Sequence, residues 1–298
     1  MKHLRNPWVI LSVMISLLAS AALGPAAVRV VSRSVANRTV DAGQPVRAAV
    51  ILRAALGVQP HSAPLHDALG LALYAQGDVT QALAEFQRAV QLNPALASAQ
   101  NNLGVTLLAL GRPTAAAAAL TQATRLNPGL ASAHLNLGYA QRAAGQREVA
   151  LAAFRRAADL DPQQMDARLQ WAALMFADGA VAEAQQAWQE VLAVEPQQPQ
   201  ALAGLGAAAV RLRHFADALQ PLQASLAQAP ETATTSYYLG LTWQALGRLD
   251  DARLAFEQAQ QFSSDPTLRR LAHMQLLVLL PSARSDESLP SRSHGSVQ

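Results

Sequence analysis

The sequence contains no cysteine. This absence excludes disulfide bonds, zinc sites built on thiolates and a lipid-modified N-terminal cysteine. Lysine is almost missing as well, since Lys2 is the only one among 298 residues. Aromatic residues make up 5% of the chain, and no stretch alternates β-branched and polar residues for long enough to predict a strand. The composition therefore favours an all-α protein with closely packed helices.

Charge is also sparse. The formal net charge is +3, and the excess of arginine lies near the two ends of the chain, while the middle is close to neutral. No basic stripe with interleaved aromatic residues is present, and such a stripe is the usual footprint of a nucleic-acid-binding surface. The sequence therefore predicts a partner other than nucleic acid.

Residues 1–28 have the pattern of an export signal or a membrane anchor. Lys2 and Arg5 precede an uncharged apolar run at residues 7–23. A basic start followed by an apolar run is typical of a signal peptide. Together with the high alanine content and the lack of lysine, it predicts a bacterial protein that leaves the cytoplasm.

Two alternatives for this segment stay open, and a buried core helix is a third. Small residues at 19–21 offer a cleavage site, which would give a mature chain that begins near Ala22. In the other alternative, the apolar run extends to Val28 and stays in the bilayer as an anchor. Both predict a periplasmic protein, or one anchored to the inner membrane and facing the periplasm. Secretion from the cell is a further alternative.

A helix–turn–helix pattern of 34 residues repeats along the middle of the chain. In residues 63–96, apolar residues recur at the spacing of one helix face on both sides of Gly77-Asp78. Glycine permits a positive φ after the first helix, and Asn93-Pro94 ends the second, because the residue before proline leaves helical geometry. Arg213 is the one exception to the turn glycine. A small residue in the first helix returns with the same period: Gly70, Gly104, Gly138, Ala172, Gly206, Gly240. A bulky residue in the second helix does so too: Phe86, Leu120, Phe154, Trp188, Leu222, Phe256.

This period and these positions resemble the tetratricopeptide repeat family. The resemblance implies an all-α fold, a right-handed α-solenoid of stacked helix hairpins with a concave inner surface. Small residues would let the two helices of a hairpin approach, and the bulky residues would fill the space between neighbouring hairpins. The six units that we predict are residues 63–96, 97–130, 131–164, 165–198, 199–232 and 233–266.

Both ends of the array are predicted to be atypical, as terminal repeats usually are. Residues 29–62 follow the same register and form a degenerate N-terminal unit, with a poor first helix over 30–41 and a clear second helix over 44–58. A capping helix is predicted at 267–280, where it would cover the last apolar face. Residues 281–298 are rich in serine and arginine and predict a disordered tail.

No motif in the sequence predicts catalysis, a cofactor or a metal. The run from Gly204 to Ala209 matches a dinucleotide-binding pattern, but no strand precedes it, so we interpret the match as chance. No two histidines stand three or four residues apart, and none shares a register with an acidic partner. His66 and His134 are interpreted as structural. No segment outside the repeats is long enough to fold a catalytic domain, so we predict a protein that is not an enzyme.

The family resemblance also implies a ligand site. Its groove is lined by positions two, five, six, nine, twelve and thirteen of each unit, and position six holds Asn102, Asn136 and Gln170. These three would form a ladder of side-chain amides, which can donate to and accept from a peptide backbone. Asparagines that only cap or meet solvent are the alternative. The predicted peptide-binding residues are Asn101, Asn102, Leu135, Asn136, Tyr139, Leu169, Gln170 and Tyr237.

The resulting hypothesis is a non-enzymatic scaffold that binds a peptide or protein partner in its groove. Assembly of an envelope, secretion or pilus-type complex is the process that the family analogy favours. A purely structural spacer and an accessory repeat subunit of an envelope enzyme complex are the alternatives. If residues 1–28 are retained, they would also bring the protein into contact with a membrane.

Overall fold

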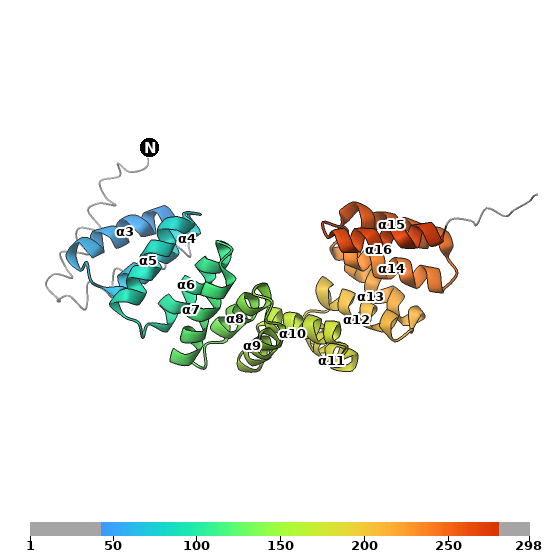
Figure 1. The fold of residues 1–298 in the computed structure, drawn as a ribbon, viewed down its shortest axis with the longest axis horizontal. Coiled ribbons are helices and arrows are strands. Elements are labelled where there is room, and N and C mark those ends of the chain that lie inside the picture. The colour runs from blue at the N-terminus through green and yellow to red at the C-terminus, as the bar shows by residue number, and fades with distance from the viewer. Residues whose placement is uncertain (1–42, 280–298) are drawn as a thin grey trace, which may run out of the picture. The chain divides into compact units, whose positions relative to one another are not determined.

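The computed structural model describes residues 43–279, which form fourteen α-helices and no strand within that range. The predicted all-α solenoid of helix hairpins is confirmed, and Figure 1 shows the hairpins in chain order. The predicted N-terminal signal or anchor segment, the helix over 30–41 and the C-terminal tail lie outside the described residues. The chain divides after Met175 into two compact units, unit 1 before this point and unit 2 after it.

Each hairpin has a first helix of 13 or 14 residues and a second helix of 14 residues. The first helices are α4 (Ala63–Ala75), α6 (Ala97–Ala109), α8 (Ala131–Ala143), α10 (Met165–Asp178), α12 (Pro199–Arg211) and α14 (Ala233–Ala245). The second helices are α5 (Val79–Leu92), α7 (Pro113–Leu126), α9 (Arg147–Leu160), α11 (Val181–Val194), α13 (Phe215–Gln228) and α15 (Leu249–Phe262). Two single helices flank them, α3 (Pro45–Val58) and α16 (Pro266–Val278).

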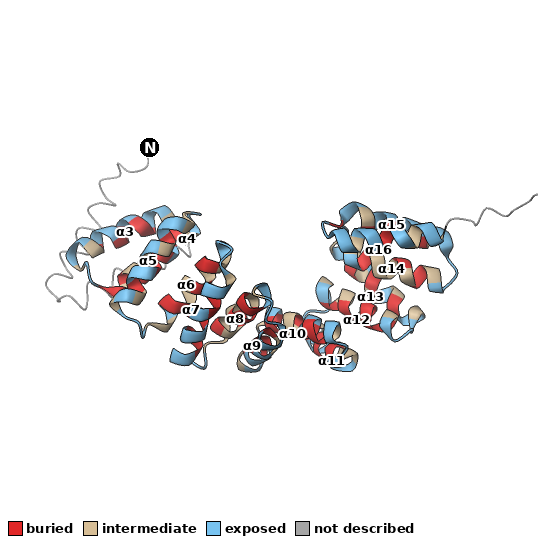
Figure 2. Ribbon diagram, viewed as in Figure 1, coloured by how far each residue is buried: buried red, intermediate tan, exposed pale blue. Residues whose placement is uncertain are grey.

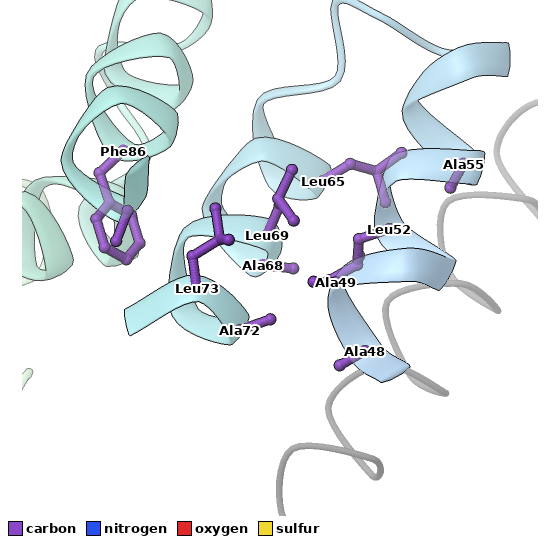
Figure 3. Close-up of a cluster of buried hydrophobic side chains, with 11 residues drawn as sticks. Ala48, Ala49, Leu52, Ala55, Leu65, Ala68, Leu69, Ala72, Leu73 and Phe86 are labelled. Atoms are coloured by element: carbon purple, nitrogen blue, oxygen red, sulfur yellow. The ribbon is translucent and has the colours of Figure 1, made fainter. Parts of the chain in front are cut away.

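Within each unit, neighbouring helices bury their apolar faces against each other (Figure 2). Figure 3 shows how α3 packs on α4 in unit 1: Leu52 from α3 lies near Leu65 and Leu69 from α4. All three are at most 2% exposed. First helices also contact each other from one hairpin to the next, α4 with α6 and α6 with α8. The face of unit 1 that carries these first helices therefore places residues of successive repeats side by side.

Glycine in the first helix makes close hairpin packing possible. A Cβ atom built on Gly138 would lie 2.5 Å from the Phe154 ring, and one on Gly70 would lie 2.6 Å from the Phe86 ring. Both rings are at most 1% exposed. The aromatic ring of the second helix therefore lies directly on the backbone of the first, where only glycine leaves room.

The dinucleotide-like run has a packing explanation. Gly206 makes room for Leu222 of its own hairpin, as the repeat pattern predicts. Gly204 makes room for Trp188, whose indole would collide with a Cβ atom at that position. Both glycines lie inside α12, so their spacing serves two helix contacts.

The turns between first and second helices use a left-handed residue. Gly77 and Gly145 have φ of 83° and 78°. Arg213 takes the same conformation with φ of 63° and is the only described residue other than glycine with a positive φ. The backbone N–H of His214 bonds to the carbonyl of Ala209 at 2.8 Å, which closes the end of α12 as in the glycine turns. The turn therefore keeps its geometry with arginine in place of glycine, although the left-handed conformation costs energy for a residue with a side chain.

We expect Gly138→Ala to destabilise unit 1 by on the order of 1–3 kcal/mol, because the added methyl group overpacks the contact with Phe154. Guanidinium unfolding followed by circular dichroism measures the change. The matched control is Gly57→Ala in α3, where no atom lies within 4 Å of the added Cβ. This control should be stabilised by up to about 1 kcal/mol. Equal stability of Gly138→Ala and wild type would contradict the packing argument.

Candidate functional site

A buried carboxylate anchors a row of polar side chains in unit 1. Asp67 lies in α4 and is 8% exposed. One of its oxygens accepts a hydrogen bond from Ser98 Oγ at 2.8 Å, and the other accepts one from Asn102 Nδ2 at 2.9 Å. Both donors come from the next repeat, so this carboxylate joins two hairpins.

The row continues through two more amides. Asn101 Nδ2 donates to Asn102 Oδ1 at 3.3 Å, and Asn136 Nδ2 donates to Asn101 Oδ1 at 3.0 Å. An ionised carboxylate only accepts hydrogen bonds, so Asn102 must turn its NH₂ group toward Asp67. Its oxygen then faces Asn101, and the same logic orients Asn136. We call Asp67, Ser98, Asn101, Asn102 and Asn136 the polar row.

A second cluster of side chains lies between α8 and α10. Tyr139 donates its hydroxyl to Asp166 Oδ2 at 2.6 Å, and Gln170 Nε2 donates to Asp166 Oδ1 at 3.3 Å. Arg142 donates to Gln170 Oε1, and its guanidinium lies 5.1 Å from the centre of the Tyr139 ring. Burial raises the pKa of Tyr139, and the hydrogen bond to Asp166 raises it further. We call Tyr139, Arg142, Asp166 and Gln170 the Tyr139 cluster.

This arrangement differs from the predicted amide ladder in two respects. Asn102 and Asn136 are connected, but through Asn101 and not directly. Gln170 bonds instead to the Tyr139 cluster, because Asp166 and Arg142 lie within its reach.

Two of the predicted binding residues are core residues. Leu135 and Leu169 are each 8% exposed. Leu135 packs in the cluster that contains Ala150 and Phe154. Packing between helices therefore covers most of the surface of these two leucines, and little of it remains for a ligand.

Unit 2 places the remaining predicted residue, Tyr237, in a group of aromatic rings. Its ring centre lies 6.1 Å from that of Tyr238 and 5.7 Å from that of Phe256. Tyr238 in turn lies 6.5 Å from Phe176, over which the Arg211 guanidinium stacks at 4.8 Å. Burial raises the pKa of both tyrosines. The group offers an aromatic surface with one cation at its edge.

The sequence prediction missed Asp67, Ser98, Arg142 and Phe176. Each of them occupies position two, five or twelve of its unit, which the family resemblance assigns to the groove. The signal was therefore present in the register, but only the structure shows that these side chains bond or stack with the predicted ones.

The two histidines of the first helices contact backbone carbonyls. His66 Nε2 lies 3.0 Å from the carbonyl of Pro60, and His134 Nε2 lies 3.1 Å from that of Pro128. His66 Nδ1 also lies 2.6 Å from the Glu85 carboxylate. The sequence shows no shared register between a histidine and an acidic residue, but α4 and α5 of one hairpin bring His66 and Glu85 together in space. Between residues 43 and 279, no three His, Asp or Glu side chains gather in a cluster that could hold a metal ion.

Sequence profiles of known protein families match the helix hairpins of this chain. A profile of TPR repeats matches residues 70–111, and a tetratricopeptide repeat profile matches residues 101–165, 169–231 and 205–266. The chain belongs to the tetratricopeptide repeat family. Folds of this family typically serve as non-enzymatic interaction scaffolds. Among curated proteins, no sequence matches this chain.

Several solved structures share the fold. The structure of pilF from Pseudomonas aeruginosa has a TM-score of 0.66 at 21% identity and covers 72% of this chain and 98% of its own. YrrB, described as a TPR protein with an unusual peptide-binding site, has a TM-score of 0.56 at 20% identity and covers 62% and 95%. The Cut9–Hcn1 structure from the APC/C has a TM-score of 0.64 at 18% identity. It covers 83% of this chain, which spans 48% of the length of that longer one. At these identities the likeness concerns the fold alone.

None of the helices in the range 43–279 is both long and apolar enough to cross a bilayer.

His134 predicts a pH dependence of stability. Burial lowers the pKa of His134, the hydrogen bond to Pro128 partly offsets this, and the charge of Arg156 lowers it again. The fold therefore favours the neutral ring. Its contribution is complete above the ordinary pKa of 6.5 and is lost as the pH falls through the lowered value in the folded protein.

We expect the melting temperature of wild type to fall more than that of His134→Gln between about pH 8 and about pH 5. The matched control is His273→Gln on α16, where the side chain is exposed. This variant should follow wild type at both pH values. An identical pH response of wild type and His134→Gln would contradict the assignment.

Proposed function

We propose that unit 1 is a non-enzymatic scaffold that binds an extended segment of a partner protein across α4, α6, α8 and α10. The observation that supports this proposal is the fixed orientation of the polar row. Each of its three asparagines uses one N–H of its amide within the row, and each amide has a second N–H. An extended backbone alternates N–H and C=O groups, which side-chain amides can match without reading a particular sequence.

The Tyr139 cluster adds contact surface beside the row. Asn136, Tyr139 and Arg142 are three residues apart along α8, so they share one face of the helix. Tyr139 is half-buried and Arg142 is exposed. Tyrosine and arginine are the residue types that most often contribute binding energy at protein interfaces. The row would therefore hold the backbone of the partner, and the cluster would hold a side chain.

The spacer alternative makes a different demand on the chain. A spacer needs helices that stack, and the glycine contacts within the hairpins supply this already. The polar row places hydrogen-bonded polar side chains across three first helices, which stacking alone does not require. This favours a binding surface over a spacer or a subunit that only connects other proteins.

A binding experiment with a double variant tests the proposal. The full chain is used to select peptides of about twelve residues from a random displayed library. The dissociation constants of the selected peptides are then measured by fluorescence anisotropy. We expect Asn101→Ala with Asn136→Ala to weaken binding about tenfold or more, since each lost hydrogen bond contributes roughly 0.5–1.5 kcal/mol. This pair leaves Asp67 with both its donors, Ser98 and Asn102, so the fold should be retained.

The control is Gln87→Ala with Gln122→Ala, two exposed amides on the second helices α5 and α7. Binding should be unchanged in this variant. If the control loses affinity while the asparagine variant keeps it, the partner binds on the second-helix side and the proposed site is wrong. If no peptide is selected, the proposal of a peptide-binding unit fails.

We propose further that the protein works outside the cytoplasm, in the periplasm or attached to the inner membrane, where it takes part in assembling an envelope, secretion or pilus-type complex. The support is the basic start and the apolar run at residues 7–23. Mass spectrometry of the native protein tests it. We expect either a mature chain that begins near Ala22 or the intact chain in the membrane fraction. An intact chain in the soluble cytoplasmic fraction would contradict export.

A further inference from the structure

The last helix, α16, carries an apolar surface toward solvent. Leu271, Met274, Leu277 and Val278 are 43%, 54%, 49% and 67% exposed. The opposite side of α16 packs on α15, where Ala272 is fully buried. Repeat arrays normally end in a polar outer face, because no further repeat covers it. The end of this array departs from that rule.

The register of α16 places a bulky residue at the position where most first helices of the array carry glycine. Met274 stands 34 residues after Gly240, at the first-helix position on which the bulky residue of the second helix lies. In the preceding hairpin, a Cβ on Gly240 would already lie 2.6 Å from Phe256. A methionine side chain fills the space that a second helix would need. The sequence of residues 280–298 also has two prolines and mostly polar residues, so it offers no amphipathic pattern to cover α16.

The exposed residues have the spacing of a helix–helix seam. Leu271, Met274 and Val278 follow each other at intervals of three and four residues, which aligns them along one line of the helix. When two identical helices pack side by side, the apolar residues along the seam of one helix are buried against those of the other. We propose that α16 pairs in an antiparallel manner with α16 of a second copy of this chain, which makes the protein a dimer.

The charges on α16 select the antiparallel orientation. Arg269 and Arg270 lie in its N-terminal half, and the helix has no acidic residue. Arg269 donates to the carbonyl of Ser263 at 2.7 Å, whereas Arg270 stands four residues before Met274, so in a parallel pair the two Arg270 side chains would face each other. An antiparallel pair that places Leu271 opposite Val278 of the other copy separates the two Arg270 side chains by about 13.5 Å along the axis. It also brings each of them to the C-terminal end of the other helix, which carries partial negative charge.

A single helix pair buries less surface than an interface of standard size. We therefore expect a dissociation constant in the micromolar range. This proposal rests on α16 alone and is independent of the peptide site in unit 1.

The first test is the mass of the full chain in solution, measured by sedimentation equilibrium between about 1 and 200 µM. The mass of wild type should rise toward that of two chains. Met274→Glu should raise the dissociation constant at least tenfold, because it places a charge in the seam on both copies. The matched control is Val149→Glu on α9, where the valine is 47% exposed. This control should dimerise as wild type does, and circular dichroism should show the same helix content for all three proteins.

The second test uses the absence of cysteine, since any disulfide must come from an introduced residue. In the antiparallel pair, position 271 lies opposite position 278 of the other copy. The double variant Leu271→Cys with Val278→Cys should therefore form a covalent dimer under mild oxidation. Leu271→Cys alone should not, because its two sulfurs would be separated by about 10 Å along the axis.

Three results would overturn the proposal. One is a wild type that stays monomeric up to about 200 µM. Another is a dimer that forms through a different surface. Met274→Glu would then leave the dimer unchanged, or Leu271→Cys alone would crosslink as well as the double variant does. The third is a monomeric wild type that binds vesicles of anionic phosphatidylglycerol while Met274→Glu does not, which would assign the face to a lipid surface.

Discussion

The contact between a bulky side chain of each second helix and the bare backbone of a first helix governs this structure. Gly70 and Gly138 let the rings of Phe86 and Phe154 lie where a Cβ atom has no room. This contact sets the distance between the helices of a hairpin. It also leaves the other side of the first helices to meet one another within a unit, as α4, α6 and α8 do in unit 1 and α12 and α14 do in unit 2. The surface on which residues of successive repeats meet is therefore a consequence of packing that happens behind it.

The polar row shows how a repeat array can gain a specific feature without leaving its register. Asp67 stands at the position that Asn101 occupies in the next repeat and Leu135 in the one after. Only the first of these is a carboxylate, and its burial requires donors. Ser98 and Asn102 supply them, and the orientation of one amide fixes that of the next. A single buried carboxylate thus orders the side chains of three helices, which the regular repeat pattern by itself would leave undetermined.

In the repeat pattern, a bulky residue of a second helix packs on a glycine of a first helix. This pattern changes in two places, at Trp188 and at the exposed face of α16. At Trp188 the bulky residue lies against Gly204, and the array continues with an added glycine. At Met274 a bulky residue replaces the glycine itself, and no second helix within residues 43–279 packs on it. In the first change, the bulky residue still packs on a glycine, but that glycine lies in the first helix of the next hairpin. The second leaves an apolar face exposed on α16.

The sequence by itself determined the helices, their order and their pairing, because a 34-residue period in small, bulky and turn residues admits few other packings. It also placed Asn101, Asn102 and Asn136 on one face. Only the tertiary structure decided what these residues contact. Leu135 and Leu169 turned out to be core residues, and Gln170 bonds to Asp166 and Arg142. His66 meets Glu85 across the hairpin. A register states which helix face a side chain lies on. Burial and hydrogen bonding depend on the neighbouring helix a few ångströms away, and the position of that helix is set by packing that no single repeat contains.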